Sequence, residues 1–154
     1  MQELRFQTDV STDPDLFWKR QSIATINQEM APLLRMTAPA QYRQLQLKDW
    51  KGETPLFSSW VLLFGLIPVD RHCFEKLDFP GEREFIETST SLNNKTWQHR
   101  RFVTATATGC TVTDELQFTP RMAWMTPVVT WIVKMAFQNR HRYLARLTHN
   151  GSAR

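Results

Sequence analysis

The sequence predicts an α+β fold in which a curved antiparallel β-sheet wraps around one long C-terminal α-helix, with two short helices after the first strand. The first observation is a series of segments between residues 56 and 119 with strand-like apolar patterns, separated by short turn signals. The second is a change of apolar period after Pro120, from two to about 3.6. Because so long a sheet twists and must bury one face, the long helix is the natural cover for it.

The N-terminal third combines a strand with two helices. Glu3–Val10 alternates apolar and polar residues, which predicts a half-buried strand. A short helix is expected over Asp13–Arg20, because aspartate caps free N–H groups and the next residue, Pro14, suits the first helical position. Apolar residues at roughly helical spacing predict a second helix over Ser22–Leu34.

The middle of the chain is mostly strand. Met36–Lys48 suggests one or two short strands, and Trp50–Pro55 is expected to be a loop. The remaining predicted strands are Leu56–Leu66, Asp70–Phe79, Arg83–Ser91, Lys95–Ala107 and Cys110–Thr119. We expect hairpin turns at Asn93-Asn94 and Thr108-Gly109, and a final helix from Thr126 to Gly151.

Length and composition predict one globular domain. With 154 residues, 42% apolar and 22% charged, we expect a single domain over residues 1–150 and a tail over 151–154. The longest apolar run, Trp60–Val69, is too short to span a bilayer, and no secretory signal is recognisable at the N-terminus. Two distant cysteines, Cys73 and Cys110, suit a reducing compartment, so a cytoplasmic protein is expected.

The net charge of +4 is unevenly distributed, because residues 116–154 hold six basic side chains and no acidic one. These cations could meet an acidic partner, or simply complement the dipole of the helix C-terminus. Nucleic acid is not the expected partner, because Asn139–Arg146 contains a single aromatic residue. Peripheral membrane contact stays open, since Arg121–Met125 places a tryptophan and two methionines beside an arginine; the alternative is a loop that plugs one end of a cavity.

Strand pairing predicts which face of the sheet is buried. If Ala107 pairs with Cys110 and Thr90 with Trp97, one face collects fifteen residues, of which nine are apolar. They are Glu84, Ile86, Thr88, Thr90, Trp97, His99, Arg101, Val103, Ala105, Ala107, Cys110, Val112, Asp114, Leu116 and Phe118. On the opposite face, Glu87 is expected to pair with Arg100 at the solvent side.

Three polar residues on this apolar face need an explanation. Asp114 lies diagonal to Arg101 in the predicted register, and His99 precedes Arg101 by two positions. Burying such charges costs several kcal/mol per ion unless they are paired, so a dry core would favour Leu or Val. We interpret His99, Arg101 and Asp114 as a polar floor in an otherwise apolar cavity. A structural ion pair at the seam of the sheet, with a core histidine beside it, is the alternative.

Four segments carry a resemblance to a known superfamily. They are SSWVLLFGLIPVDRH (residues 58–72), REFIETSTSLNNKTWQHRRFV (83–103), GCTVTDELQFTP (109–120) and FQNRHRYL (137–144). With the order of elements, they resemble a small bacterial group within the START-like superfamily, also called SRPBCC, which includes birch-pollen-allergen-like proteins and polyketide cyclases. The resemblance implies a helix-grip fold with a cavity between sheet and helix. It assigns no chemistry, because the superfamily holds carriers, receptors, cyclases and oxygenase subunits.

The predicted function is binding or carriage of an apolar or aromatic small molecule in that cavity. The expected lining residues are Trp60, Leu62, Phe64, Ile86, Trp97, His99, Arg101, Val112, Asp114, Leu116, Trp131, Ile132 and Met135. One alternative is a cyclase- or dehydratase-type enzyme that uses His99 or Asp114 for acid–base chemistry. Another is an interaction module that acts through the basic C-terminal region.

Neither a cofactor nor a metal is expected. The sequence has no GxGxxG, P-loop or GxSxG motif. The candidate metal ligands lack the close spacing of CxxC or HExxH sites; they are His72, Cys73, His99 and Cys110.

Overall fold

The computed structural model describes residues 1–151, with side chains for residues 1–147; residues 152–154 of the predicted tail lie outside the described residues. In chain order the elements are β1 (Gln2–Val10), α1 (Pro14–Lys19), α2 (Ile23–Met30), β2 (Leu34–Met36), α3 (Ala40–Arg43), the 3-10 helix η1 (Leu47–Asp49), β3 (Phe57–Leu63), β4 (Ile67–Asp78), β5 (Glu84–Ser91), β6 (Asn94–Thr106), β7 (Gly109–Pro120), the 3-10 helix η2 (Ala123–Met125) and α4 (Thr126–Gly151).

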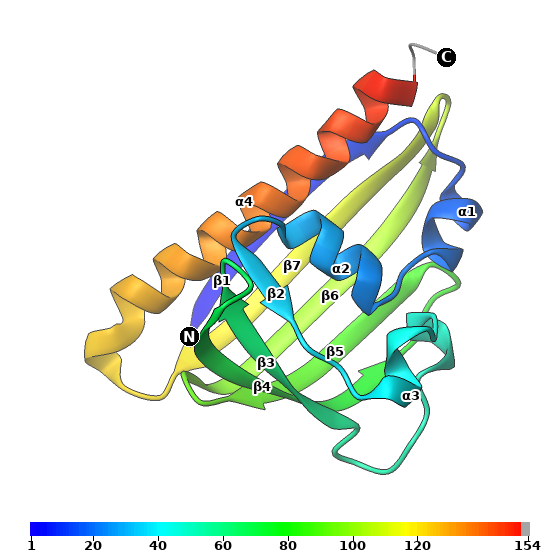
Figure 1. Ribbon diagram of the computed structural model, residues 1–154. Helices are drawn as coiled ribbons and strands as arrows, with labels where there is room; N and C mark the ends of the chain where they lie inside the picture. The colour runs from blue at the N-terminus through cyan, green and yellow to red at the C-terminus, as the bar shows by residue number, and fades with distance from the viewer. Residues whose placement is uncertain (152–154) are drawn as a thin grey trace.

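The seven strands form one antiparallel sheet in the order β1-β7-β6-β5-β4-β3-β2. Figure 1 shows the sheet curling around a concave side, with α4 running along it above β1 and with α2 and β2 crossing in front. The expected helix-grip arrangement of a curved sheet and a long C-terminal helix is therefore confirmed.

Local capping explains both short helices. The Asp13 carboxylate accepts hydrogen bonds from the N–H groups of Asp15 and Leu16 at 3.0 Å. Ser22 and Thr25 form a reciprocal capping box at the start of α2. This helix ends at Met30 and not at Leu34 as expected, because Ala31 precedes Pro32 and the residue before a proline avoids the helical conformation.

The expectation of strands over Met36–Lys48 is wrong beyond Met36, where α3 and η1 replace them. This segment places Tyr42 and Leu47 in the core, and Trp50 follows directly after η1 and is buried as well. The two aromatic rings pack against Phe57, at centroid distances of 4.6 Å for Tyr42 and 5.1 Å for Trp50. In this segment the large apolar side chains have irregular spacing, and α3 and η1 place them over the end of the sheet.

The hairpin of β6 and β7 has the predicted inner face with a register shifted by two residues. Arg101 lies directly opposite Asp114, and the turn residues are Ala107 and Thr108. Gly109 belongs to β7, where a Cβ atom would lie 2.1 Å from the backbone oxygen of Val10, so only glycine fits this close approach. Because the shift is even, every side chain keeps its predicted face.

The predicted register of β5 is wrong by one residue, which reverses its two faces. Phe85 pairs with Arg101, and Glu87 pairs with His99. The last residues that pair are Ser89 and Trp97, and in the connection between them the Ser91 hydroxyl accepts hydrogen bonds from the N–H groups of Asn93 and Asn94. The inward residues are Phe85, Glu87 and Ser89, and the outward ones are Ile86, Thr88 and Thr90.

The solvent-side partner of Arg100 is consequently not Glu87. Arg100 donates to Glu84 at 2.5 Å and to Glu115 at 3.0 Å on the outer face. The hydrogen bond with Glu84 raises the pKa of the Arg100 guanidinium, and the hydrogen bond with Glu115 raises it by a smaller amount.

The core consists of two apolar clusters. The larger one packs α2, α3, the inner face of the sheet and the first half of α4. The smaller one contains Val10, Phe17, Val103, Cys110, Val112 and Leu144. Along the β6–β7 hairpin, the pair of Arg101 and Asp114 lies between Leu116 of the first cluster and Val112 of the second.

Candidate functional site

Arg101 is the centre of a buried polar network. Its Nε and Nη2 donate to the two oxygens of Asp114, each at 2.8 Å. Nη1 and Nη2 donate to the two oxygens of Glu29 at 2.9 and 3.0 Å, and Nη1 also donates to Gln21 at 2.9 Å. All five guanidinium N–H groups therefore have an acceptor, although the side chain is fully buried.

Asp114 joins the sheet to the C-terminal helix. Its oxygens also accept from Nε2 of His99 and Nε2 of His141, both at 2.7 Å. The other ring nitrogen of His141 contacts the Thr8 hydroxyl at 2.8 Å. Burial would raise the pKa of Asp114, but Arg101 and the two histidines outweigh it and hold the pKa well below its usual range.

Glu29 brings α2 into the same network. Besides its two bonds from Arg101, it accepts from Nε of Arg140 on α4 at 2.8 Å. Burial opposes its ionisation, yet the two arginines prevail and lower the pKa of Glu29. The same burial would lower the pKa of Arg101, whereas Asp114 and Glu29 raise it, so this ionised cluster is held by mutual pairing.

Glu87 forms a second buried acceptor on the inner face of β5. It accepts from Nε2 of His72 at 2.5 Å and from the Ser89 hydroxyl at 2.6 Å. Nδ1 of His99 lies 3.6 Å from its other oxygen, so His99 sits between Glu87 and Asp114. Burial raises the pKa of Glu87, but the contacts of His72 and then His99 outweigh this and lower it strongly.

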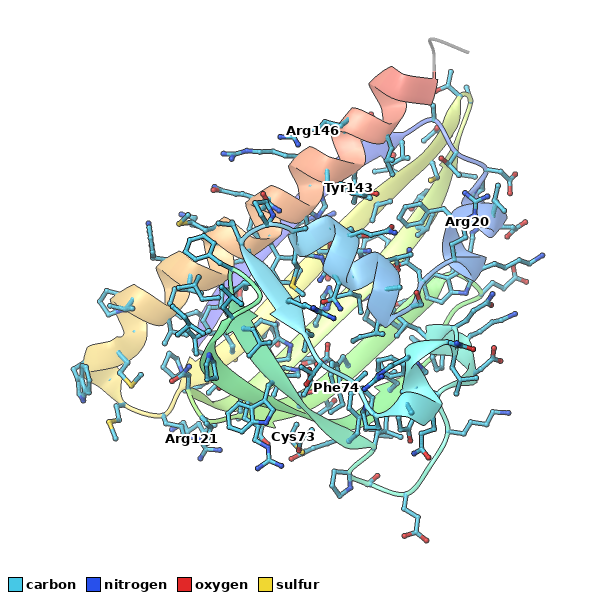
Figure 2. All side chains as sticks on the ribbon, in the orientation of Figure 1. Arg20, Cys73, Phe74, Arg121, Tyr143 and Arg146 are labelled. Carbon is cyan, nitrogen blue, oxygen red and sulfur yellow. The ribbon has the colours of Figure 1, made fainter. Side chains whose placement is uncertain are left out.

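A cavity of about 150 Å³ lies between the concave side of the sheet, α2 and α4. Figure 2 shows Phe74 among the side chains that fill this side of the sheet. Its apolar lining is Ile26, Met30, Leu34, Met36, Leu47, Trp50, Val61, Val69, Phe74, Leu77, Phe85, Trp97, Val129, Ile132, Val133, Ala136 and Phe137. The polar lining is Gln21, Asp70, His72, Glu87, Asn93, Asn94, His99 and Arg140. The buried network thus contributes a polar wall to an apolar cavity.

Three cavity-lining residues carry a buried polar atom without a hydrogen-bond partner among the described residues. They are Trp50 and Trp97, through their indole Nε1, and Asn94, through Oδ1. An unsatisfied buried donor or acceptor costs about 1–3 kcal/mol, and native proteins contain few of them. Two indole N–H donors and one amide oxygen among the cavity-lining residues therefore lack a partner within the described residues.

The structure brings only part of the predicted site to the cavity. Trp97, His99 and Ile132 line it. Arg101 and Asp114 lie in the network behind His99. Other predicted lining residues belong to the closed core, Leu116 in the larger cluster and Val112 in the smaller one. Which of these contacts a ligand stays a prediction.

The other predicted lining residues lie away from the cavity. Ile86 is turned outward by the β5 register. Trp60 is on the outer face of β3, under the guanidinium of Arg71, because its neighbour Val61 takes the inward position. Phe64 lies in the β3–β4 turn with a positive φ of 53° and is exposed. Trp131 is exposed, and the half-buried side chains of Leu62 and Met135 also lie outside the lining.

The sequence interpretation missed six polar members of the network. They are Gln21, Glu29, His72, Glu87, Arg140 and His141. A signal existed for some of them: Glu29 follows Ile26 by three residues, and His141 follows Phe137 by four, so both sit on buried helix faces.

The described residues offer neither a metal site nor a membrane-spanning helix. Within them, no group of three or more His, Cys, Asp or Glu side chains could hold a metal ion. In the same part of the chain, no helix has the length and apolar character needed to cross a membrane.

Solved structures with the same fold have little sequence identity to this chain. A START superfamily protein from Mycobacterium smegmatis has a TM-score of 0.63 at 6% identity, with 96% of this chain and 97% of that chain covered. Protein CV1439 from Chromobacterium violaceum has a TM-score of 0.67 at 12% identity, with 95% and 96% covered. DynU16, from the dynemicin biosynthetic locus, has a TM-score of 0.52 at 14% identity, with 92% and 46% covered.

These similarities show that the fold is the START-like, or SRPBCC, helix-grip fold that the sequence segments suggested. No curated protein matches the chain. Residues 8–148 match the domain of unknown function DUF8410, and the chain therefore belongs to this family.

Proposed function

We propose that the protein binds a small aromatic molecule with a polar substituent in the cavity between the sheet and α4. The observation that carries this proposal is a cavity with apolar walls whose lining residues include Trp50, Asn94 and Trp97, each with a buried polar atom that lacks a partner. Ligand sites in proteins have this composition, with apolar walls for affinity and a few polar groups for orientation.

The size of the cavity limits the ligand. A volume of about 150 Å³ is comparable to that of an engineered apolar cavity that holds benzene. A single substituted ring therefore fits, whereas a multi-ring or long-chain lipid would require the walls to move apart.

The walls favour an aromatic ligand with a hydrogen-bonding group. The ring centroids of Trp97 and Phe137 are 6.5 Å apart, and both residues line the cavity. Aromatic rings gain about 0.5–1.5 kcal/mol from well-oriented neighbours beyond the area they bury. A hydroxyl or carbonyl oxygen on the ligand can accept from an indole N–H, and a hydroxyl can also donate to the Asn94 amide.

Calorimetric titration with p-cresol and toluene tests the proposal. We expect saturable one-site binding of both, with p-cresol tighter by about five-fold, because one hydrogen bond contributes about 1 kcal/mol. Ala136→Leu fills the cavity without removing a polar atom and should abolish both signals. Ala145→Leu, on the same helix and outside the cavity lining, is the matched control and should bind normally.

Failure to observe saturable binding of either ring would contradict the proposal. So would equal binding by wild type and Ala136→Leu, because the ligand would then occupy another place. Trp97→Phe keeps an aromatic ring at this position and removes the indole N–H donor, and it should weaken binding of p-cresol more than binding of toluene.

Acid–base chemistry at His72 is a second candidate function. Asp114 is not suited to the expected catalytic role, because it is fully buried, accepts four hydrogen bonds and lies outside the cavity lining. Both ring nitrogens of His99 face carboxylates. His72 also lines the cavity, and only its Nε2 is hydrogen-bonded among the described residues, to Glu87. Such a carboxylate-oriented imidazole keeps one ring nitrogen for proton transfer.

This second candidate is tested on molecules that native mass spectrometry finds retained by the purified protein. If wild type converts such a molecule, His72→Asn should still bind it and lose conversion by at least about 100-fold, the usual contribution of a general acid or base. Unchanged conversion by His72→Asn would exclude the role, and His99→Asn tests the neighbouring histidine in parallel.

A further inference from the structure

The most exposed large apolar side chains gather at one end of the molecule. Among residues 1–147, whose side chains the structure describes, nine such residues expose at least 52% of their surface, and apart from Met1 they belong to three segments. These are the β3–β4 turn with the start of β4, the β5–β6 turn, and η2 with the first turns of α4. We call the eight residues the apolar end: Phe64, Leu66, Ile67, Leu92, Met122, Trp124, Val128 and Trp131.

Hydrogen bonds join the three segments. The backbone N–H of Arg121 donates to the carbonyl of Asn93 at 2.9 Å, and its Nε donates to the carbonyl of Ser91 at 2.7 Å. The Asn93 side chain in turn donates to the carbonyl of Val69 at 3.0 Å. Figure 1 shows the β5–β6 turn beside the segment that leads into α4. The apolar end is therefore one region of the surface.

The apolar end borders the cavity. Each of its three segments also contributes residues to the lining: Val69, Asn94 and Val129. Ile132, next to Trp131, both lines the cavity and is 36% exposed, so its side chain lies at the boundary between the cavity and the surface.

The charges around the apolar end are positive. Exposed cations in residues 64–71, 92–95 and 121–134 are Arg71, Lys95, Arg121 and Lys134. Asp70 is the acidic residue within these ranges, which leaves a net charge of +3. Its carboxylate already accepts from the N–H groups of Arg71 at 2.9 Å and Asn93 at 3.2 Å. Figure 2 shows Arg121 at the lower edge of the molecule, directed outward.

We propose that the apolar end docks on an anionic lipid bilayer, with the cavity facing the membrane. Tryptophans combined with long basic side chains are typical of the headgroup region, where the rings insert and the cations stay at the surface. Apolar burial and attraction to anionic lipids act together at such surfaces. The cavity would then open toward the membrane, from which an aromatic ligand could enter; this last step alone rests on the proposed function.

Co-sedimentation with vesicles tests the docking without any ligand. The full chain should bind vesicles of phosphatidylcholine mixed with phosphatidylglycerol, should bind pure phosphatidylcholine much more weakly, and should dissociate at high salt. Lys95→Gln with Lys134→Gln should weaken binding to the mixed vesicles by at least ten-fold, because each lysine near an anionic surface contributes roughly five-fold. Trp124→Ala with Trp131→Ala should have a comparable effect.

Leu45→Ala with Phe79→Ala is the matched control, because these exposed apolar residues lie in other segments. It should bind vesicles like the wild type. Melting curves and p-cresol titrations of each variant report folding and the cavity separately, so loss of docking is distinguished from failure of the proposed function.

Three results would overturn the proposal. One is the absence of sedimentation with either type of vesicle. Another is equal binding by wild type and the lysine variants, which change only exposed side chains and are expected to fold. The third is a dimer that the tryptophan variants disrupt without any binding to vesicles, which would show that a second copy of the chain covers the apolar end.

Discussion

Arg101 shows how a fully buried cation can be kept in this core. Its guanidinium has two carboxylate partners, Asp114 on the neighbouring strand and Glu29 on α2, and both are bound through two N–H groups. Bidentate pairing of this kind is strong and directional. The position of α2 against the sheet is therefore specified by hydrogen-bond geometry as well as by apolar contact.

Removing Asp114 should be strongly destabilising. Asp114→Ala leaves two guanidinium N–H groups and two histidines without their acceptor, and we expect a loss of about 3–5 kcal/mol in the free energy of unfolding. An apolar replacement of the pair, Arg101→Met with Asp114→Leu, should not restore stability, because Glu29 would keep Arg140 as its only cation partner. Adding Glu29→Gln should recover part of the loss.

Denaturant melts of these three variants and the wild type measure the effects. A change below about 0.5 kcal/mol for Asp114→Ala would place this residue at the surface. If the double variant regained the full free energy of unfolding, the buried charge of Glu29 would not need Arg101 as a partner.

Glu29, Glu87 and Asp114 should make stability sensitive to acid. All three have a pKa that is lower in the folded protein than its ordinary value, and carboxyl groups of unfolded chains titrate near about 4. Their stabilisation is complete above that value and is lost as pH falls toward the folded-state values, because the unfolded chain binds more protons.

Urea melts between pH 7 and 3 should show a steep loss of the free energy of unfolding below about pH 4. In Glu87→Gln the slope should be shallower by up to about 1.4 kcal/mol per pH unit; identical slopes would mean that Glu87 does not contribute.

At the scale of elements, the register of β5 decides which side chains reach the cavity. In the observed register Phe85 pairs with Arg101 and points inward with Glu87, and Glu87 then accepts from His72. A one-residue slip exchanges the two faces of a strand because side chains alternate with a period of two. The outward strand face carries Ile86, which has no role in the lining.

Paired substitutions on β5 check this register. Phe85→Ala should destabilise by about 3–5 kcal/mol, since the ring is buried against Trp18 and His99. Thr88→Ala changes an exposed side chain on the opposite face and should stay within about 0.5 kcal/mol. If denaturant melts showed a larger loss of stability for Thr88→Ala than for Phe85→Ala, the β5 register expected from the sequence would be the correct one.

For the whole molecule, α4 is both the cover of the sheet and a source of network partners. Its buried side chains include Val129, Val133, Phe137 and Leu144. The same helix supplies Arg140 to Glu29 and His141 to Asp114. The polar network lies between the two apolar clusters, and the cavity of about 150 Å³ is lined by residues of the larger one.

Truncation after Met125 should therefore abolish folding. The four buried side chains of α4 contribute about 6–12 kcal/mol by burial, which is comparable to the whole stability of a domain, about 5–15 kcal/mol. Circular dichroism should show one cooperative melt for the full chain, as expected for a single domain over residues 1–150, and none for residues 1–125. A cooperative melt of the shorter chain would show that the sheet folds without its helix.

The fold was predictable because its signals are local. The alternating patterns, the Asp13 cap and the change of period at Thr126 each act within a few residues. The inner face of β6 and β7 was predictable as well, since an even shift of register leaves every side chain on its face, and this brought His99, Arg101 and Asp114 together correctly.

The composition of the cavity depended on tertiary structure. The β5–β6 register differs by one residue from the one expected for a turn at Asn93-Asn94, and this moved Ile86 out and Glu87 in. Glu29 and His141 became partners of Arg101 and Asp114 only because α2 and α4 cross the sheet at those positions. Such contacts join residues more than 25 positions apart, and their energies arise from burial and pairing that no local pattern encodes.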